Sequence, residues 1–260
     1  MSLGFCRNNY VKIANMKIII GNWKTYLDSP KEAKSLLEKY KILSKKKNVA
    51  LMLAPSHIHL LPLRSSYKGK SLSFVAQSLG FSGAHTGCTS ARQIKEAKVD
   101  MALVGHSEER ARGLDDEGVA KKVQEAHKSK ILPIIIVGEH KRDSEAEHYK
   151  FVRKQIQSAL KYYPANKPLK FIIAYEPVWA VGAARPPSAR DIEMMMIYIR
   201  KTLVKLFGDR KGRSVPLIYG GSVNSLSAAS ILSLQEVSGV LLGRASVDAK
   251  ELEAIISKIK

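Results

Sequence analysis

The stretch FIIAYEPVWAVG, residues 171–182, is an apolar run that ends in a tyrosine and a glutamate, followed at once by proline and tryptophan. A carboxylate at the end of a buried run lowers stability unless it has a partner or a function. Similar short apolar runs occur throughout the chain. Together they predict eight β-strands, at KIII from Lys17, VALML from Val49, LSFVA from Leu72, MALV from Met101, PIIIV from Pro133, FIIA from Phe171, PLIY from Pro216 and GVLL from Gly239.

The longer segments between these runs have helical spacing. After the two prolines at 186–187, Ser188 is expected to cap a helix, with Asp191 three residues on. One apolar face of this helix is then predicted to contain Ile192, Met195, Ile199, Leu203 and Leu206. The methionines on it are interpreted as core residues.

Continuous apolar strands that alternate with amphipathic helices predict an α/β protein with a parallel sheet covered by helices. Eight such units favour a closed (β/α)8 TIM barrel, although an open doubly wound sheet has the same alternation. Polar and glycine-rich residues follow six of the runs, as GNWK, GHSEE, GE, YEP, GGS and GR. In a barrel these strand ends converge on one face, where active sites are built, whereas in an open sheet they would form a line of sites that is harder to explain, so the barrel is preferred. We expect a single domain over residues 16–260, preceded by an N-terminal extension, 1–15, with Met16 as an alternative start.

The composition limits the class of protein. Of 260 residues, 45% are apolar, no run is long enough to span a membrane, and Cys6 and Cys88 are the two cysteines. We therefore expect a cytoplasmic protein without structural disulfides. The net charge of +20 favours anionic ligands. The densest basic segment, residues 39–48, is interpreted as a solvated face in preference to a nucleic-acid patch.

Taken together, the motifs at the strand ends resemble those of triosephosphate isomerases, from Lys17 to about Ile259. The matching segments are GNWK (21–24), AQ (76–77), GAHTG (83–87), GHSEER (105–110), VGE (137–139), AYEPVWAVG (174–182), YGGSV (219–223) and LLGRAS (241–246). The resemblance implies a homodimeric (β/α)8 enzyme of glycolysis and gluconeogenesis. Its reaction would interconvert dihydroxyacetone phosphate and glyceraldehyde 3-phosphate.

This reaction needs a base that removes a proton beside a carbonyl and returns it to the neighbouring carbon. The resemblance implies that Glu176 is this base and that His106 is a neutral electrophile. This pairing of a glutamate with a neutral histidine is the established pattern of the family. If Ser107 starts a helix, its N-terminus disfavours imidazolium at His106. Lys24 is expected to attract negative charge. Asn22 would orient polar groups beside it, and Glu108 would pair with it.

The phosphate group of the substrate is expected to bind backbone N–H groups at Gly182, Ser222, Gly243 and Arg244, all near helix N-termini. We expect neither a metal nor a cofactor, because no Cys/His/Asp cluster has ligand spacing. The loop GAHTG resembles one that reaches the neighbouring subunit, where Thr86 approaches the partner's active site.

Two segments depart from the family pattern. After the tryptophan segment the chain reads Gly182, Ala183, Ala184, Arg185, Pro186 and Pro187. Pro187 has no N–H for the hydroxyl of Tyr219, which predicts a stiffer hinge. In the interface loop, Cys88 stands where the family pattern has a glutamate, and Glu109, in the segment GHSEER, stands where it has the arginine that pairs with this glutamate across the dimer. An alternative function, without isomerase activity, is the binding of anionic partners or nucleic acid through the basic surface.

Overall fold

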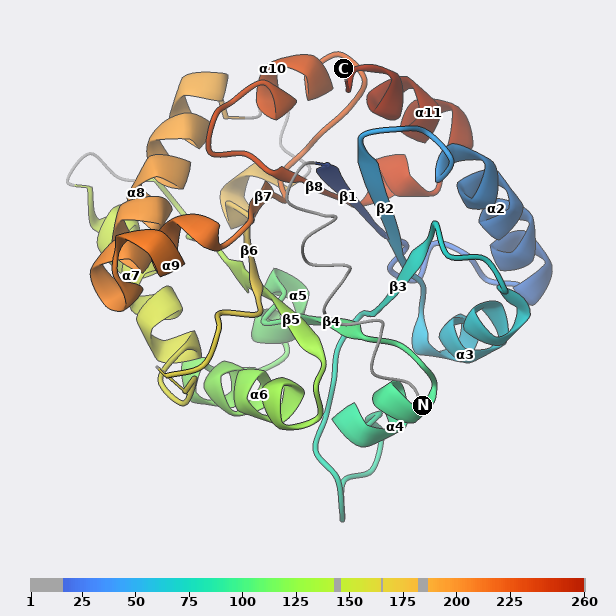
Figure 1. The fold of residues 1–260 in the computed structure, drawn as a ribbon, viewed down its shortest axis with the longest axis horizontal. Helices are drawn as coiled ribbons and strands as arrows, with labels where there is room; N and C mark the ends of the chain where they lie inside the picture. The colour runs from blue at the N-terminus through green and yellow to red at the C-terminus, as the bar shows by residue number, and fades with distance from the viewer. Residues whose placement is uncertain (1–15, 143–145, 165, 182–186, 260) are drawn as a thin grey trace.

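A computed structural model describes residues 16–142, 146–164, 166–181 and 187–259. In it, eight parallel strands pair in chain order and β8 pairs with β1, which closes the barrel (Figure 1). The strands are β1 Lys17–Asn22, β2 Val49–Ala54, β3 Ser73–Ala76, β4 Met101–Val104, β5 Leu132–Val137, β6 Ile172–Tyr175, β7 Leu217–Tyr219 and β8 Gly239–Leu242. Each predicted strand starts within one residue of its observed start, and the closed barrel is confirmed.

The strands are apolar throughout because both of their faces are buried. In β1, Ile18 and Ile20 point into the barrel, where they pack with residues of all the other strands, such as Met52 and Leu103. Ile19 points outward, into the layer between the strands and the helices. A strand covered on both sides loses the alternation of a half-exposed strand, so it reads as a continuous apolar run.

Helices form the outer layer (Figure 1). They are α2 Pro30–Leu43, α3 His57–Ser66, α4 Ala91–Glu96, α5 Ser107–Ala111, α6 Asp116–Lys128, α7 Glu147–Ala159, α8 Ala189–Phe207, α9 Asp209–Ser214, α10 Ala228–Leu232 and α11 Ala249–Ser257, with short 3-10 helices η1 Val178–Ala180 and η2 Arg244–Ser246. No helix among the described residues is long and apolar enough to cross a membrane.

The start of α8 is as the sequence predicts. The Ser188 hydroxyl accepts the N–H of Asp191, and the Asp191 carboxylate accepts the N–H of Ser188, which is a capping box. The predicted apolar face is wrong at its end, because Leu206 is 39% exposed. Phe207 instead turns toward the core, where its ring lies 6.3 Å from that of Phe171.

The topology separates two kinds of connection. Those from a strand to the following helix lie at the carboxyl ends of the strands, and those from a helix to the following strand lie at the opposite end. The connection from β3 to α4 extends away from the barrel, at the bottom of Figure 1.

Candidate active site

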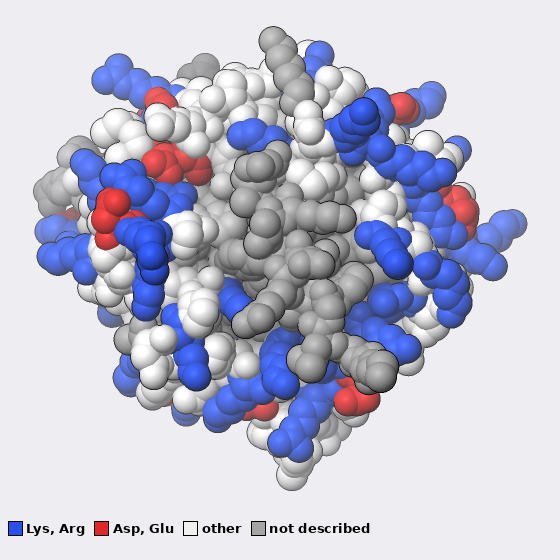
Figure 2. Space-filling view, viewed as in Figure 1, with Lys and Arg blue, Asp and Glu red and all other residues white. Residues whose placement is uncertain are grey.

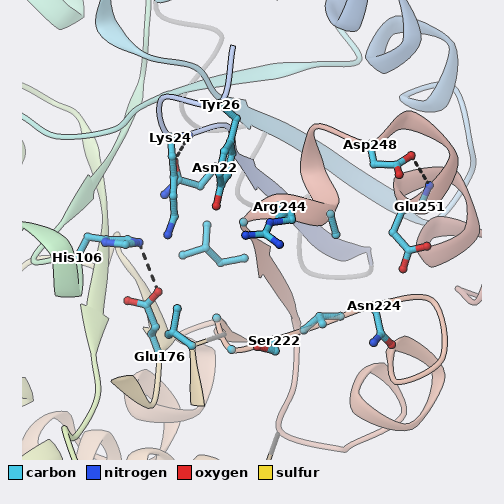
Figure 3. A pocket seen from close by; sticks show the side chains of 17 residues that line it. Asn22, Lys24, Tyr26, His106, Glu176, Ser222, Asn224, Arg244, Asp248 and Glu251 are labelled. Atoms are coloured by element: carbon cyan, nitrogen blue, oxygen red, sulfur yellow. Dashed lines mark hydrogen bonds and ion pairs between the residues drawn. The ribbon is translucent and has the colours of Figure 1, made fainter. Parts of the chain in front are cut away.

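A pocket of about 620 Å³ opens at the carboxyl ends of β1, β4, β6, β7 and β8 (Figure 3). Among the residues that line it are the predicted site residues Asn22, Lys24, His106, Glu176, Ser222, Gly243 and Arg244. Glu108 lies outside this lining and reaches the pocket through Lys24. Thr86 is exposed on the β3–α4 connection, away from the pocket, and Gly182 lies outside the described residues.

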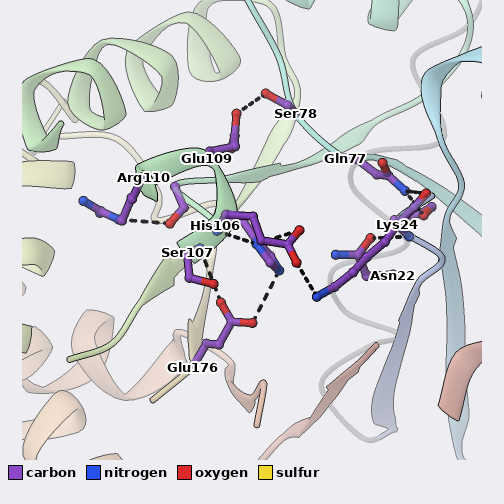
Figure 4. Close-up of polar contacts among 12 residues, drawn as sticks. Asn22, Lys24, Gln77, Ser78, His106, Ser107, Glu109, Arg110 and Glu176 are labelled. Carbon is purple, nitrogen blue, oxygen red and sulfur yellow. Dashed lines mark hydrogen bonds and ion pairs between the residues drawn. The ribbon is translucent and has the colours of Figure 1, made fainter. Parts of the chain in front are cut away.

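Glu176 directly follows β6 and is only 4% exposed. Its Oε1 lies 3.4 Å from Nε2 of His106, and its Oε2 accepts the backbone N–H of Ser107 at 3.4 Å (Figure 4). Both contacts are long, so the carboxylate is oriented but keeps the capacity to accept a proton. A glutamate in this setting suits a general base.

A glycine on the neighbouring strand end allows Glu176 to approach this closely. A Cβ atom at Gly138 would lie 1.8 Å from the carbonyl oxygen of Glu176, so no larger residue fits without moving the backbone. The N–H of Glu176 also donates to the carbonyl of Val137, at 2.8 Å. The end of β5 therefore sets the position of the carboxylate.

His106 follows β4 and is the N-cap of α5, as the sequence predicts. Its Nδ1 accepts the backbone N–H of Glu108, at 3.2 Å. A nitrogen that accepts a hydrogen bond carries no proton, so the ring holds its proton on Nε2, the nitrogen that faces Glu176 and the pocket. The site therefore presents an N–H donor next to a carboxylate.

Lys24 adopts a backbone conformation that is rare for a residue with a side chain, with φ +46°. This left-handed conformation costs about 1 kcal/mol or more, and such strain tends to persist at functional sites. Two hydrogen bonds hold it: the Lys24 N–H donates to Oδ1 of Asn22 at 3.1 Å, and the side-chain amide of Gln77 donates to the Lys24 carbonyl at 2.9 Å (Figure 4).

The ammonium group of Lys24 lies 2.7 Å from Oε1 of Glu108. Partial burial of Glu108 opposes ionisation, but the hydrogen bond and the charge of Lys24 outweigh it and lower the pKa of this carboxyl. Glu108 therefore stays ionised and keeps the lysine directed into the pocket mouth.

Two further polar residues, Gln77 and Glu139, support the site, although no role was predicted for either from the sequence. Gln77 follows β3 and also donates to the carbonyl of Ala54, at 2.9 Å. Glu139, after β5, is 2% exposed, and its Oε1 accepts the Tyr175 hydroxyl at 2.9 Å and the Trp179 indole N–H at 2.8 Å. Burial and this carboxylate raise the pKa of Tyr175 far above its usual value. Gln77 and Glu139 both lie just after a buried strand, and this position is the signal that could have identified them.

The end of the pocket opposite His106 is formed after β7 and β8 (Figure 3). Gly243 and Arg244 lie at the start of η2, near a helix N-terminus as expected. The same expectation is wrong for Ser222, because α10 begins only at Ala228. The hydroxyl of Ser222 donates to the carbonyl of Ala180, at 3.0 Å, and so ties this loop to the segment after Glu176.

Comparison with known proteins agrees with this geometry. The model of the triosephosphate isomerase family matches residues 17–259. The triosephosphate isomerase of Alkaliphilus oremlandii is 33% identical over 244 residues, which covers 92% of this chain and 98% of that protein. The enzymes of the same name from Moorella thermoacetica and Caldanaerobacter subterraneus are 31% and 33% identical, over 92% of this chain. With this similarity over nearly its whole length, the chain belongs to the triosephosphate isomerase family.

Proposed function

We propose that this barrel is a triose-phosphate isomerase in which Glu176 moves the proton and His106 polarises the substrate oxygen. The reaction interconverts dihydroxyacetone phosphate and glyceraldehyde 3-phosphate. The observation that carries the assignment of roles is the 3.4 Å approach of the Glu176 carboxylate to the Nε2 of His106, whose other nitrogen already accepts a backbone N–H.

The proton transfer follows from this arrangement. Glu176 removes a proton from the carbon beside the carbonyl, and the electron pair moves onto the carbonyl oxygen to form an enediolate. The N–H of His106 donates a hydrogen bond to that oxygen as its charge grows. Glu176, now protonated, returns the proton to the neighbouring carbon. At the same time the hydroxyl proton of the neighbouring oxygen passes to the former carbonyl oxygen by way of His106, so the aldose and the ketose interconvert without any added reagent.

The cation of Lys24 lies close enough to serve both the enediolate and the phosphate. Its attraction for negative charge grows as the enediolate forms, which is the form of binding that accelerates a reaction. The phosphate group of the substrate occupies the other end of the pocket, at the backbone N–H groups of Ser222, Gly243 and Arg244. Gly182 belongs to the same proposal, although it is outside the described residues.

The first test is the turnover of glyceraldehyde 3-phosphate by the purified protein and by its Glu176→Ala variant. We expect kcat to fall by at least about a hundredfold in the variant, because general base catalysis contributes about 10² to 10⁴. Glu253→Ala, which removes an exposed glutamate from α11, is the matched control and should retain full activity. Equal and negligible rates in all three proteins would favour the alternative function, a barrel that only binds anions.

We further propose that the chain acts as a homodimer in the cytoplasm. The exposed β3–α4 connection, with Thr86 near its tip, is the surface through which a second copy would bind, and Thr86 would approach the partner's pocket. The low cysteine content suits a reducing compartment. Equilibrium sedimentation of the purified protein tests the dimer, and a monomer at micromolar concentration would contradict it.

A further inference from the structure

The two ends of the barrel differ strongly in charge. Among the described residues, the connections that follow the strands carry six Lys and Arg and seven Asp and Glu, when the short helix α5 is counted as part of the connection from β4 to α6. The connections that lead from the helices into the strands carry thirteen Lys and Arg and only three acids, when the short helix α9 is counted as part of the connection from α8 to β7. The positive charge therefore gathers on the face opposite the candidate active site, which we call the basal face.

Two basic clusters dominate the basal face. The first consists of Lys45, Lys46 and Lys47, before β2, and of Lys68 and Lys70, before β3, and all five side chains are exposed. The second consists of Lys161, Lys167 and Lys170, before β6, and of Arg210, Lys211 and Arg213, before β7.

The clusters lie on opposite sides of the barrel. In a closed barrel of eight strands in chain order, the pair β2 and β3 is diametrically opposite the pair β6 and β7. The view in Figures 1 and 2 agrees, since the connections into β2 and β3 and those into β6 and β7 lie on opposite sides, and Lys and Arg far outnumber acids on the surface shown. An extended anion that crosses this face would contact both clusters.

Little in the described residues neutralises this charge. The three acids of these connections each pair with one cation: Asp100 with Lys95, Asp209 with Arg213, and Glu236 with Arg200. Lys161 pairs with Glu117, at 3.2 Å. The five lysines of the first cluster form no ion pair within the described ranges. Their mutual repulsion stabilises nothing in the fold, which points to an external anion.

We propose that the basal face binds the phosphate backbone of a nucleic-acid duplex, without reading its sequence. A duplex carries one negative charge per about 1.7 Å of its axis, so it matches charge spread over two separated clusters. Nine of the eleven cluster side chains are lysines, which act as point charges on phosphates and lack the bidentate geometry by which arginine recognises guanine.

Other anionic partners fit less well. Single-stranded nucleic acid requires exposed aromatic rings for its bases, and membrane attachment requires apolar side chains in addition to charge. Among the described residues of these connections, Tyr162 is the one large apolar side chain that is exposed, and its hydroxyl donates to Glu117 at 2.7 Å. The sequence alone favoured a solvated face for residues 39–48. The basic residues of the two clusters are far apart along the chain, and only the folded barrel places them on one face of the molecule.

Fluorescence anisotropy with a labelled duplex of random sequence tests the proposal. If about six phosphates are contacted, the slope of log Kd against log salt is about 5, so affinity falls about a thousandfold between 50 and 200 mM salt. The combined variant Lys45→Gln, Lys46→Gln and Lys47→Gln is expected to lower this slope by about 2 to 3 and to weaken binding at 50 mM salt at least tenfold.

A control separates the basal face from the net charge. Lys31→Gln, Lys34→Gln and Lys250→Gln, combined, remove the same charge from exposed positions near the starts of α2 and α11, at the other end of the barrel. They are expected to weaken binding less than threefold. Isomerase activity of the basal variant, which lies far from the pocket, confirms that it folds.

Three results would overturn the proposal. These are equal weakening by the two sets of substitutions, the absence of duplex binding at 50 mM salt, and binding to vesicles of anionic phospholipid without binding to the duplex. None of them bears on the isomerase mechanism, because that mechanism uses the opposite face.

Discussion

At the scale of single residues, Tyr219 differs most from its neighbours in the site. Its hydroxyl is buried and has no hydrogen-bond partner among the described residues, and burial raises its pKa well above the usual value. The Tyr175 hydroxyl, by contrast, donates to Glu139. A buried hydroxyl without a partner contributes no hydrogen-bond energy, whereas removal of one that donates to a buried carboxylate costs about 1 to 3 kcal/mol.

Tyr219→Phe is therefore expected to keep kcat/KM within about threefold and to leave the free energy of unfolding unchanged or higher. Pro187, which has no N–H to offer the hydroxyl, supports the same expectation. Tyr175→Phe, as the matched variant, is expected to destabilise the protein by about 1 to 3 kcal/mol. Steady-state kinetics and urea unfolding measure both effects. A tenfold loss of activity in Tyr219→Phe would mean that its hydroxyl finds a partner during turnover.

At the scale of elements, the ends of three adjacent strands are joined by one side chain. The amide of Gln77, after β3, donates to the carbonyl of Ala54 in β2 and to that of Lys24 after β1. Gln77→Ala removes both hydrogen bonds, each of which contributes about 1 kcal/mol. We expect the free energy of unfolding to fall by about 2 kcal/mol. The loss in kcat/KM, expressed as a free energy, should be larger than this, because the strained conformation of Lys24 loses its support.

The variant Gln77→Glu distinguishes a donor from a space-filling group, since a carboxylate has the same shape but cannot donate. It should be impaired at least as much as Gln77→Ala at neutral pH. Full activity in Gln77→Glu would show that the amide only fills space, and the strain at Lys24 would then need another explanation.

The elements themselves were largely predictable from the sequence. Strands buried on both faces are continuous apolar runs, so the start of each of the eight strands was located to within one residue. The polar and glycine-rich residues after six of the runs indicated most of the pocket. The left-handed conformation of Lys24 was not predictable, because local preference assigns that conformation to glycine. Neither was the exposure of Leu206, which depends on how the last turn of α8 packs and not on its periodicity.

At the scale of the whole molecule, the proposed dimer surface contains almost no charge. The β3–α4 connection, residues 77–90, has no Lys, Arg, Asp or Glu. Glu109, at which the sequence predicts the loss of an intersubunit salt bridge, is neutralised within its own chain: Lys122 donates to its Oε1 at 2.7 Å, and the Ser78 hydroxyl donates to the same oxygen. Apolar and hydrogen-bond contacts would then hold the proposed dimer.

The dissociation constant of the dimer should therefore change less than about threefold between about 0.1 and 0.5 M salt. Already at about 0.1 M salt, charges more than about 10 Å apart are screened from one another, so distant surface charges add little to this change. For Cys88→Glu we expect the opposite, a strong dependence of the dimer dissociation constant on salt. The added carboxylate would meet the partner's Glu109 without a free cation beside it. The dimer should therefore be weaker at low salt and regain its strength at high salt. Cys88→Ser is the neutral control. Sedimentation at the two salt concentrations measures all three proteins, and a wild-type dimer that dissociates in high salt would mean that ion pairs outside this connection hold it.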